Sequence, residues 1–199
     1  MNLKNKTCIV TGGASGIGLA IAKRYVSDGA NVVIADLKAD QAEAVARDLS
    51  ILGTGKAIGV AMDVTNEEQV NAGVAKTVET FGTVDVLVSN AGIQIVHPIE
   101  DFPFVDWKKL LSIHLDGAFL TTKACLPQMY KQGSGSVIYM GSVHAKEASP
   151  LKSAYVTAKH GLIGLVRSLA LEVAGKGITV NAICPGYVET ELTDAAIER

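Results

Sequence analysis

The chain is long enough to bury the core of one compact domain. It has 199 residues, of which 48% are hydrophobic and 19% charged, a composition too apolar for a disordered chain, so we expect residues 1–199 to form a single domain. Lys and Arg number 18 against 20 Asp and Glu. This balance lacks the positive charge that a phosphate backbone or an anionic membrane surface attracts, which argues against nucleic acid and membranes as partners.

Short runs of β-branched residues alternate along the chain with longer segments of helical periodicity. Apolar residues recur at three- and four-residue spacing between the runs, as at Ile17, Ala20, Ile21 and Tyr25, which gives each helix one face to pack on a sheet. This repeat predicts an α/β fold with a doubly wound parallel sheet flanked by helices. The runs expected to be strands are 7–10, 31–35, 57–62, 84–89, 136–140 and 179–183.

The ends of several helices are marked in the sequence. Gly29 is expected to stop the first helix, and Asn66 to cap a later one, with Gln69 as the returning residue of a capping box. The longest helical patterns run over about 107–131 and 153–174. No linker or low-complexity stretch divides the chain.

A glycine-rich turn joins the first strand to the first helix over residues 11–18. Gly12 permits a tight turn, Gly16 lets the backbone approach a pyrophosphate, and Gly18 lets the helix pack near the strand. The free N–H groups at the start of the helix attract phosphate. Strand, turn and helix in this order predict a dinucleotide-binding fold of the Rossmann type.

An acidic residue ends the second predicted strand. Asp36 stands where a carboxylate accepts hydrogen bonds from the adenosine ribose and repels a 2′-phosphate, which favours NAD over NADP. An alternative is that Asp36 only caps the next helix. Asp63 ends the third strand in a similar way, and Asn90 follows the fourth.

The cysteines do not form a recognisable ligand set. Cys8, Cys125 and Cys184 are widely separated and lack the C-x-x-C spacing of a metal site or redox pair, so we expect small buried residues and no metal. The N-terminus lacks the apolar region of a signal peptide, and charged residues interrupt the apolar segment 162–173. The sequence therefore predicts a soluble cytoplasmic protein without a membrane span.

Five motifs in one order resemble the short-chain dehydrogenase/reductase family over nearly the whole chain. They are the T-G-x-x-x-G-x-G turn at 11–18, Asn90-Ala91-Gly92, Ser142, Tyr155-x-x-x-Lys159 and a final segment at 185–190. The resemblance implies an oxidoreductase in which Asp63 lies beside adenine and Thr190 near the nicotinamide carboxamide. The full implied set of NAD-contacting residues is Gly12, Ser15, Gly16, Ile17, Gly18, Asp36, Asp63, Val64, Asn90, Ala91, Gly92, Tyr155, Lys159, Pro185, Gly186, Val188 and Thr190.

The chemistry of the Tyr155 and Lys159 pair follows from their spacing, because residues four apart share one face of a helix. A free tyrosine titrates near pH ~10, whereas a cation at ~4 Å in a medium of effective dielectric ~20 contributes about 4 kcal/mol, roughly three pK units. Tyr155 is therefore expected to take the proton of an alcohol as hydride leaves, or to return it to a carbonyl oxygen. Ser142 is expected to hold the substrate oxygen.

Two departures separate the chain from the family pattern. His114 stands where the family has an asparagine that supports a water relay to the lysine. We expect the imidazole to replace that asparagine as a catalytic residue and to titrate near pH ~6.5. Members also usually continue for about fifty residues past this point, with a last strand and much of the substrate lid, so the resemblance implies a fragment or a natural short form.

Within the family, residues 141–160 and 114–127 resemble the bacterial 3-hydroxybutyrate dehydrogenases. That resemblance implies that Gln94, His144 and Lys152 hold the substrate carboxylate, and that the protein interconverts 3-hydroxybutyrate and acetoacetate. A homotetramer built on the two longest helices is also implied. Other readings are a reductase for 3-oxoacyl or sugar-alcohol substrates, or an inactive cofactor-binding or assembly module.

Overall fold

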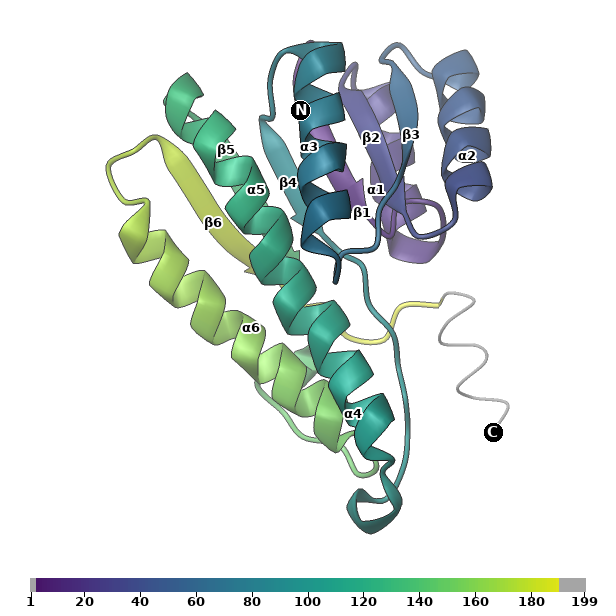
Figure 1. Cartoon of the computed structure of the whole chain (residues 1–199), viewed down its shortest axis with the longest axis vertical. Helices are drawn as coiled ribbons and strands as arrows, with labels where there is room; N and C mark the ends of the chain where they lie inside the picture. Colours follow the sequence, from purple (N-terminus) through teal and green to yellow (C-terminus); the bar gives the residue numbers. More distant parts are fainter. Residues whose placement is uncertain (1–2, 190–199) are drawn as a thin grey trace.

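The computed structural model describes residues 3–189, in which strands and helices alternate (Figure 1). The strands of the described residues are β1 Thr7–Thr11, β2 Asn31–Asp36, β3 Ala57–Ala61, β4 Val86–Ser89, β5 Gly135–Met140 and β6 Ile178–Ile183. The α-helices are α1 Gly16–Ser27, α2 Ala39–Leu52, α3 Glu67–Phe81, α4 Phe104–Leu111, α5 Gly117–Gln132 and α6 Ser153–Glu172. Short 3-10 turns lie at Ile99–Asp101 (η1) and Val143–Ala145 (η3), and a π-helical turn at Ser112–Asp116 (η2).

The strands form one parallel sheet in the order β3-β2-β1-β4-β5-β6. The expected doubly wound α/β sheet is confirmed, and each expected strand lies within two residues of the observed one. The strand order reverses between β1 and β4, where the two connections leave in opposite directions. In such sheets ligands bind at the carboxyl ends of the strands beside this reversal.

Two apolar clusters cover the two faces of the sheet. Helices α3, α5 and α6 pack on one face and α1 and α2 on the other, and Figure 1 shows the first group lying over the near face of the strands. The central strand β1 is buried along its whole length. Its burial explains why residues 8–10 are apolar without alternation, since both faces of the strand are covered.

The helix ends follow the sequence signals with one change. Helix α1 ends at Ser27, and Gly29 takes a φ of +88° after it, which favours glycine. Asn66 caps α3, because its Oδ1 accepts from the backbone N–H of Gln69 at 3.0 Å. The Gln69 side chain, however, accepts from the N–H of Asp63 at 2.9 Å instead of closing the box on Asn66.

The long helical pattern at 107–131 is not one regular helix. It is divided into α4, the π turn η2 and α5, which the sequence prediction missed because a π turn keeps helical backbone angles and changes only the hydrogen-bond spacing. The pattern at 153–174 is the single helix α6, as expected.

The expectation that all three cysteines are buried is wrong for one of them. Cys8 and Cys125 are buried in the two sheet cores, whereas Cys184 is exposed. Cys184 follows the last residue of β6, so it lies beyond the covered part of the strand. The burial of the other two raises their thiol pKa values to about 12, which leaves them protonated and unreactive.

Candidate active site

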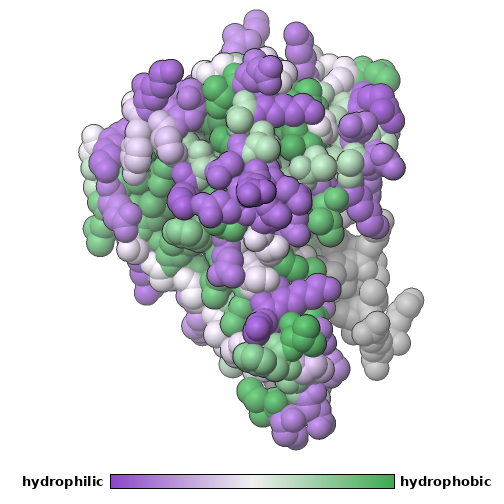
Figure 2. Space-filling view, viewed as in Figure 1, coloured by the Kyte–Doolittle hydropathy of each residue, from purple (hydrophilic) through white to green (hydrophobic). Residues whose placement is uncertain are grey.

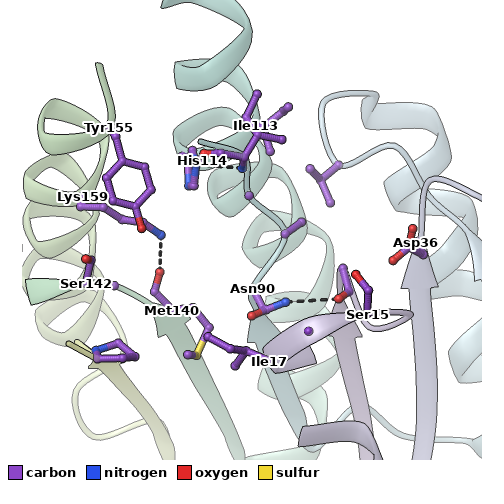
Figure 3. Close-up of a pocket in the computed structure, with 18 of the residues that line it drawn as sticks. Ser15, Ile17, Asp36, Asn90, Ile113, His114, Met140, Ser142, Tyr155 and Lys159 are labelled. Carbon is purple, nitrogen blue, oxygen red and sulfur yellow. Dashed lines mark hydrogen bonds between the residues drawn. The ribbon is translucent and has the colours of Figure 1, made fainter. Parts of the chain in front are cut away.

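A cavity of about 640 Å³ opens at the carboxyl ends of the strands, above the reversal between β1 and β4. Figure 3 shows Tyr155, Lys159 and Ser142 on one side of it and Ser15 and Asp36 on the other. Most of the residues expected to bind cofactor line it. They are Gly12, Ser15, Gly16, Ile17, Asp36, Asp63, Val64, Asn90, Ala91, Gly92, Tyr155, Lys159, Pro185, Gly186 and Val188.

The glycine-rich turn takes a backbone shape that side chains would prevent. Gly12 and Gly16 have φ angles of +61° and +50°, in the left-handed region. A Cβ on Gly18 would overlap the carbonyl oxygen of Gly12. Gly18 does not line the cavity, and its absent side chain serves the close packing of α1 against the turn.

The turn is fixed to the neighbouring strand by Asn90. Its Nδ2 donates to the carbonyl oxygen of Thr11 at 2.9 Å and to that of Gly12 at 3.3 Å. The Thr11 hydroxyl in turn accepts from the backbone N–H groups of Asn90 and Ala91 at 2.9 and 3.0 Å. These reciprocal bonds hold the ends of β1 and β4 in one arrangement beneath the cavity.

Asp36 contacts the turn as well as the cavity. Its carboxylate accepts from the backbone N–H of Ala14 at 3.1 Å and, through the other oxygen, from that of Lys38 at 3.5 Å. Helix α2 begins at Ala39 with Lys38 as its cap residue, so the alternative of Asp36 as the helix cap is wrong. The carboxylate remains at the cavity wall, where it faces any ligand that follows the turn.

Tyr155 and Lys159 lie on the first turns of α6, and Ser142 is the second residue after the end of β5. The Lys159 ammonium donates to the carbonyl oxygen of Met140 at 2.6 Å and lies 5.3 Å from the centre of the Tyr155 ring. Ser142 is 8% and Lys159 4% exposed. Three polar side chains from two elements therefore converge at one end of the cavity.

The pKa values of Tyr155 and Lys159 differ from those expected from the sequence. Burial lowers the pKa of Lys159 to about 8, against a small opposite effect of Cys184. Burial also raises the pKa of Tyr155, and hydrogen bonding with Ser142 offsets only part of that rise. The expected lowering of the Tyr155 pKa by three units is thus absent, because burial penalises the charged form of both groups.

His114 lies in the π turn and is 4% exposed. Its Nε2 lies 2.8 Å from the carbonyl oxygen and 3.2 Å from the backbone nitrogen of Ile93. Burial and the charge of Lys159 lower its pKa to about 4, although the bond to Ile93 opposes this. The expected titration near pH 6.5 is therefore moved to more acidic pH.

The residues expected to hold a carboxylate do not line the cavity. Gln94 lies in the loop after β4, His144 in η3 and Lys152 next to the start of α6, and none of the three is among the lining residues. The His144 ring is 6.0 Å from the Tyr155 ring, centre to centre, and its buried Nδ1 has no hydrogen-bond partner among the described residues. Thr190, also predicted to bind the cofactor, lies outside the described residues.

Several cavity residues were missed by the sequence analysis. Leu37, Met62, Ile93, Ile113 and Met140 all line the cavity. Three of them immediately follow or end a strand, so the carboxyl end of each predicted strand was the signal that pointed to them. The backbone carbonyl of Met140 also accepts the hydrogen bond from Lys159, which a sequence pattern does not reveal.

A model of the family described as short chain dehydrogenase matches residues 6–199. The chain belongs to the short-chain dehydrogenase family. Within residues 3–189, no group of three His, Cys, Asp or Glu side chains is placed to hold a metal ion, and no helix is long and apolar enough to cross a membrane.

This short-chain dehydrogenase is similar to proteins with different named substrates. It is 43% identical to a D-beta-hydroxybutyrate dehydrogenase of Rhizobium meliloti, over 96% of this chain and 75% of that protein. It is also 34% identical to a 3-oxoacyl-acyl-carrier-protein reductase of Thermotoga maritima, over 100% of this chain and 80% of that protein. A crystal structure of a short-chain type dehydrogenase/reductase from Mycobacterium marinum superposes with a TM-score of 0.94 at 32% identity, over 99% of this chain and 78% of that one.

The residues present fit the nicotinamide dinucleotide that this fold binds. The positive φ angles of Gly12 and Gly16 leave the turn without side chains where phosphates approach, and the start of α1 points its free N–H groups toward the same space. Ser15, the residue before the helix, makes no side-chain capping bond. Its hydroxyl therefore does not occupy the N–H groups of the first turn.

Proposed function

We propose that this short-chain dehydrogenase uses NAD to interconvert 3-hydroxybutyrate and acetoacetate. The observation that carries the proposal is the convergence of Tyr155, Ser142 and Lys159 at one end of a cavity whose other end is the glycine-rich turn with Asp36. The cavity thus offers a long binding site for a dinucleotide and, next to it, a proton-transfer group beside a hydroxyl donor.

A nicotinamide ring bound beside Tyr155 supplies the hydride acceptor. Ser142 donates a hydrogen bond to the substrate oxygen, and Tyr155 takes the hydroxyl proton as the carbon–hydrogen bond breaks. Tyr155 takes this proton as a phenolate and becomes a phenol, and Lys159 holds positive charge near that phenolate, with its position set by the bond to the Met140 carbonyl. The overall change is an alcohol and the oxidised cofactor to a ketone, the reduced cofactor and one proton.

The choice of NAD over NADP is assigned to Asp36. Replacing Asp36 by Asn removes the negative charge and keeps an oxygen acceptor for the N–H of Ala14, whereas Asp36→Ala removes both. We expect Asp36→Asn to raise the affinity for NADPH relative to NADH by about tenfold or more, because unit charges at ~4 Å interact by several kcal/mol near a protein surface. Asp36→Ala should weaken both cofactors as the turn loosens.

Fluorescence titration with NADH and NADPH measures these affinities. Tighter binding of NADPH than of NADH by the unmodified protein would show that Asp36 does not set the preference.

A small hydroxy acid is favoured as substrate by the surroundings of Tyr155. The buried Nδ1 of His144 has no partner in residues 3–189, and an unpaired buried nitrogen costs about 1–3 kcal/mol. A ligand carboxylate bound beside Tyr155 would relieve that cost, with Lys152 and Gln94 as additional donors. The relative from Rhizobium meliloti, whose name states hydroxybutyrate, supports the same substrate for this chain.

The proposal is tested by NADH formation with D-3-hydroxybutyrate and an uncharged secondary alcohol such as 2-butanol. We expect turnover of the acid, a loss of about 10² to 10⁴ in Tyr155→Phe with cofactor affinity retained, and a higher KM for the acid alone in Lys152→Ala. Equal KM increases for acid and alcohol in Lys152→Ala would contradict the carboxylate clamp. Lys146→Ala is the matched control, because Lys146 is an exposed lysine of the same segment.

A 3-oxoacyl or sugar-alcohol reductase is the second candidate, since the relative from Thermotoga maritima carries a 3-oxoacyl name. Turnover of a 3-oxoacyl thioester or a sugar alcohol without turnover of the hydroxy acid would favour it. Cofactor binding without any turnover would favour the inactive module. The cytoplasmic location stays a prediction from the sequence.

A further inference from the structure

His114 connects three parts of the active site that are distant in sequence. It lies in the π turn between α4 and α5, with its ring at the cavity wall. One edge of the ring contacts the backbone of Ile93, in the loop after β4. The ring also meets that of Tyr155 edge to face, at 5.4 Å between centres and an angle of 87°.

The two contacts with Ile93 cannot both be hydrogen bonds at one time. Nε2 lies 2.8 Å from the Ile93 oxygen and 3.2 Å from the Ile93 nitrogen, and a ring nitrogen either carries a hydrogen or accepts one. The shorter distance assigns the hydrogen to Nε2, which donates to the carbonyl. An amide side chain, in contrast, would offer a donor and an acceptor on separate atoms.

The absence of a side chain at position 92 makes room for the ring. A Cβ on Gly92 would overlap the Cε1 atom of His114 and would lie 3.1 and 3.2 Å from its two nitrogens. The ring has little freedom to move away, because it is almost fully buried between Ile93 and Tyr155. Gly92 and His114 are therefore matched in size.

We propose that His114 is a positioning residue, a strut that sets the distance between the Gly92–Ile93 loop at the cofactor and the Tyr155 ring, with Gly92 as its obligatory partner. This inference rests on the proposed role of Tyr155. It gives His114 a task other than the proton relay expected from the sequence. The charged and titratable groups that face the ring are Lys159 and Tyr155, and the Lys159 ammonium is already bonded to Met140.

The hydrogen bond is tested with two replacements of His114. His114→Asn keeps a donor and an acceptor for Ile93 and should retain kcat within about threefold. His114→Leu keeps a similar volume without the bond, and we expect kcat to fall about tenfold or more, since the Ile93 carbonyl then loses its buried donor. A melting temperature close to that of the unmodified protein separates positioning from unfolding. Equal kcat in His114→Leu and the unmodified protein would overturn the proposal.

The size match is tested with Gly92→Ala alone and combined with His114→Asn. We expect Gly92→Ala to weaken NADH binding about tenfold or more, and the double variant to recover most of that loss because Asn is smaller than His. If Gly92→Ala alone does not fold, a folded double variant supports the size match in the same way as recovered NADH binding. Additive effects, with no recovery, would overturn the proposal.

The NADH-binding readout is independent of the substrate assignment, whereas the kcat comparisons need a substrate that the protein turns over. NADH binding is followed by fluorescence, so it reports on the strut even if 3-hydroxybutyrate is not turned over, which would refute only the proposed substrate. The relay alternative makes a different prediction, namely that His114→Asn abolishes an acid limb in the pH profile of kcat. A positioning role for His114 predicts the same pH profile of kcat in His114→Asn and in the unmodified protein.

Discussion

Tyr155 and Lys159 share a buried end of the cavity, where neither group favours its charged form. The pKa of Lys159 is lowered to about 8 by burial and that of Tyr155 is raised by it. Alcohol oxidation needs a proton acceptor at this pair, so the pair must first lose one proton. We therefore expect kcat/KM for oxidation to rise with pH through about 8 and kcat/KM for ketone reduction to fall over the same range.

A pH–rate profile of the unmodified protein and of Lys159→Met checks this expectation. In Lys159→Met the rise of kcat/KM for oxidation should move to higher pH, toward the raised pKa of Tyr155. The reason is that Lys159, the group of the pair that loses its proton first, is absent. Persistence of a limb near pH 8 in that variant would assign it to another group.

At the residue scale, the sequence predicted the motif positions better than their chemistry. Gly12, Gly18 and Asn90 were identifiable because their roles depend on backbone geometry close to a known turn. The pKa values of Tyr155 and Lys159 were not, because they depend on burial by segments far away in the chain. The same holds for the carbonyl of Met140, which any residue would provide.

At the scale of elements, the strands were predictable because apolar β-branched runs bounded by glycines have few other structures available. The π turn at Ser112–Asp116 was not, since its sequence continues a helical pattern. Its end is fixed by tertiary packing, as a Cβ on Gly117 would lie 2.7 Å from the side chain of Val64. Such a contact exists only once the chain is folded.

The starts of β1 and β4 are joined by the carboxylate of Asp85. It accepts from the Lys6 ammonium at 2.8 Å, the Thr7 N–H at 2.9 Å and the Thr83 hydroxyl at 3.0 Å. We expect Asp85→Ala to lower the free energy of unfolding by about 1–3 kcal/mol, because the buried Thr7 N–H and the half-buried Thr83 hydroxyl lose their acceptor. Urea unfolding at pH 7 measures the loss, with Asp101→Ala as an exposed control.

The contribution of Asp85 should depend on pH. Burial raises its pKa, but the bonds from Lys6, Thr7 and Thr83 outweigh this, and the pKa lies below its usual value. Its stabilisation is therefore present above the unfolded-state pKa of about 4 and is lost as pH falls through the folded-state value. An Asp85→Ala loss that is as large at pH 2 as at pH 7 would contradict this account.

At the scale of the whole molecule, hydrophobic residues reach the surface among hydrophilic ones over α3, α5 and α6 (Figure 2). Phe119 of α5 is 52% and Leu171 of α6 is 79% exposed. We expect a homotetramer in which α5 and α6 pack against the same helices of a second copy of the chain. The double variant Phe119→Glu with Leu171→Glu places charges in that interface, so we expect it to form a smaller assembly. Sedimentation velocity checks the mass, and an unmodified protein that sediments as a monomer would exclude this interface.

The sheet consists of two halves, β1 to β3 and β4 to β6, that meet where β1 and β4 pair over residues 8–10 and 86–88. Side chains close this seam at both ends, with Asp85 at its start and Asn90 with Thr11 at its finish. The closure by Asn90 and Thr11, at the carboxyl ends of β1 and β4, is also the floor of the cofactor cavity. The joint between the halves and the floor of the binding site thus share the side chain of Asn90, and a change at Asn90 that weakens cofactor binding also alters how firmly the two halves hold together.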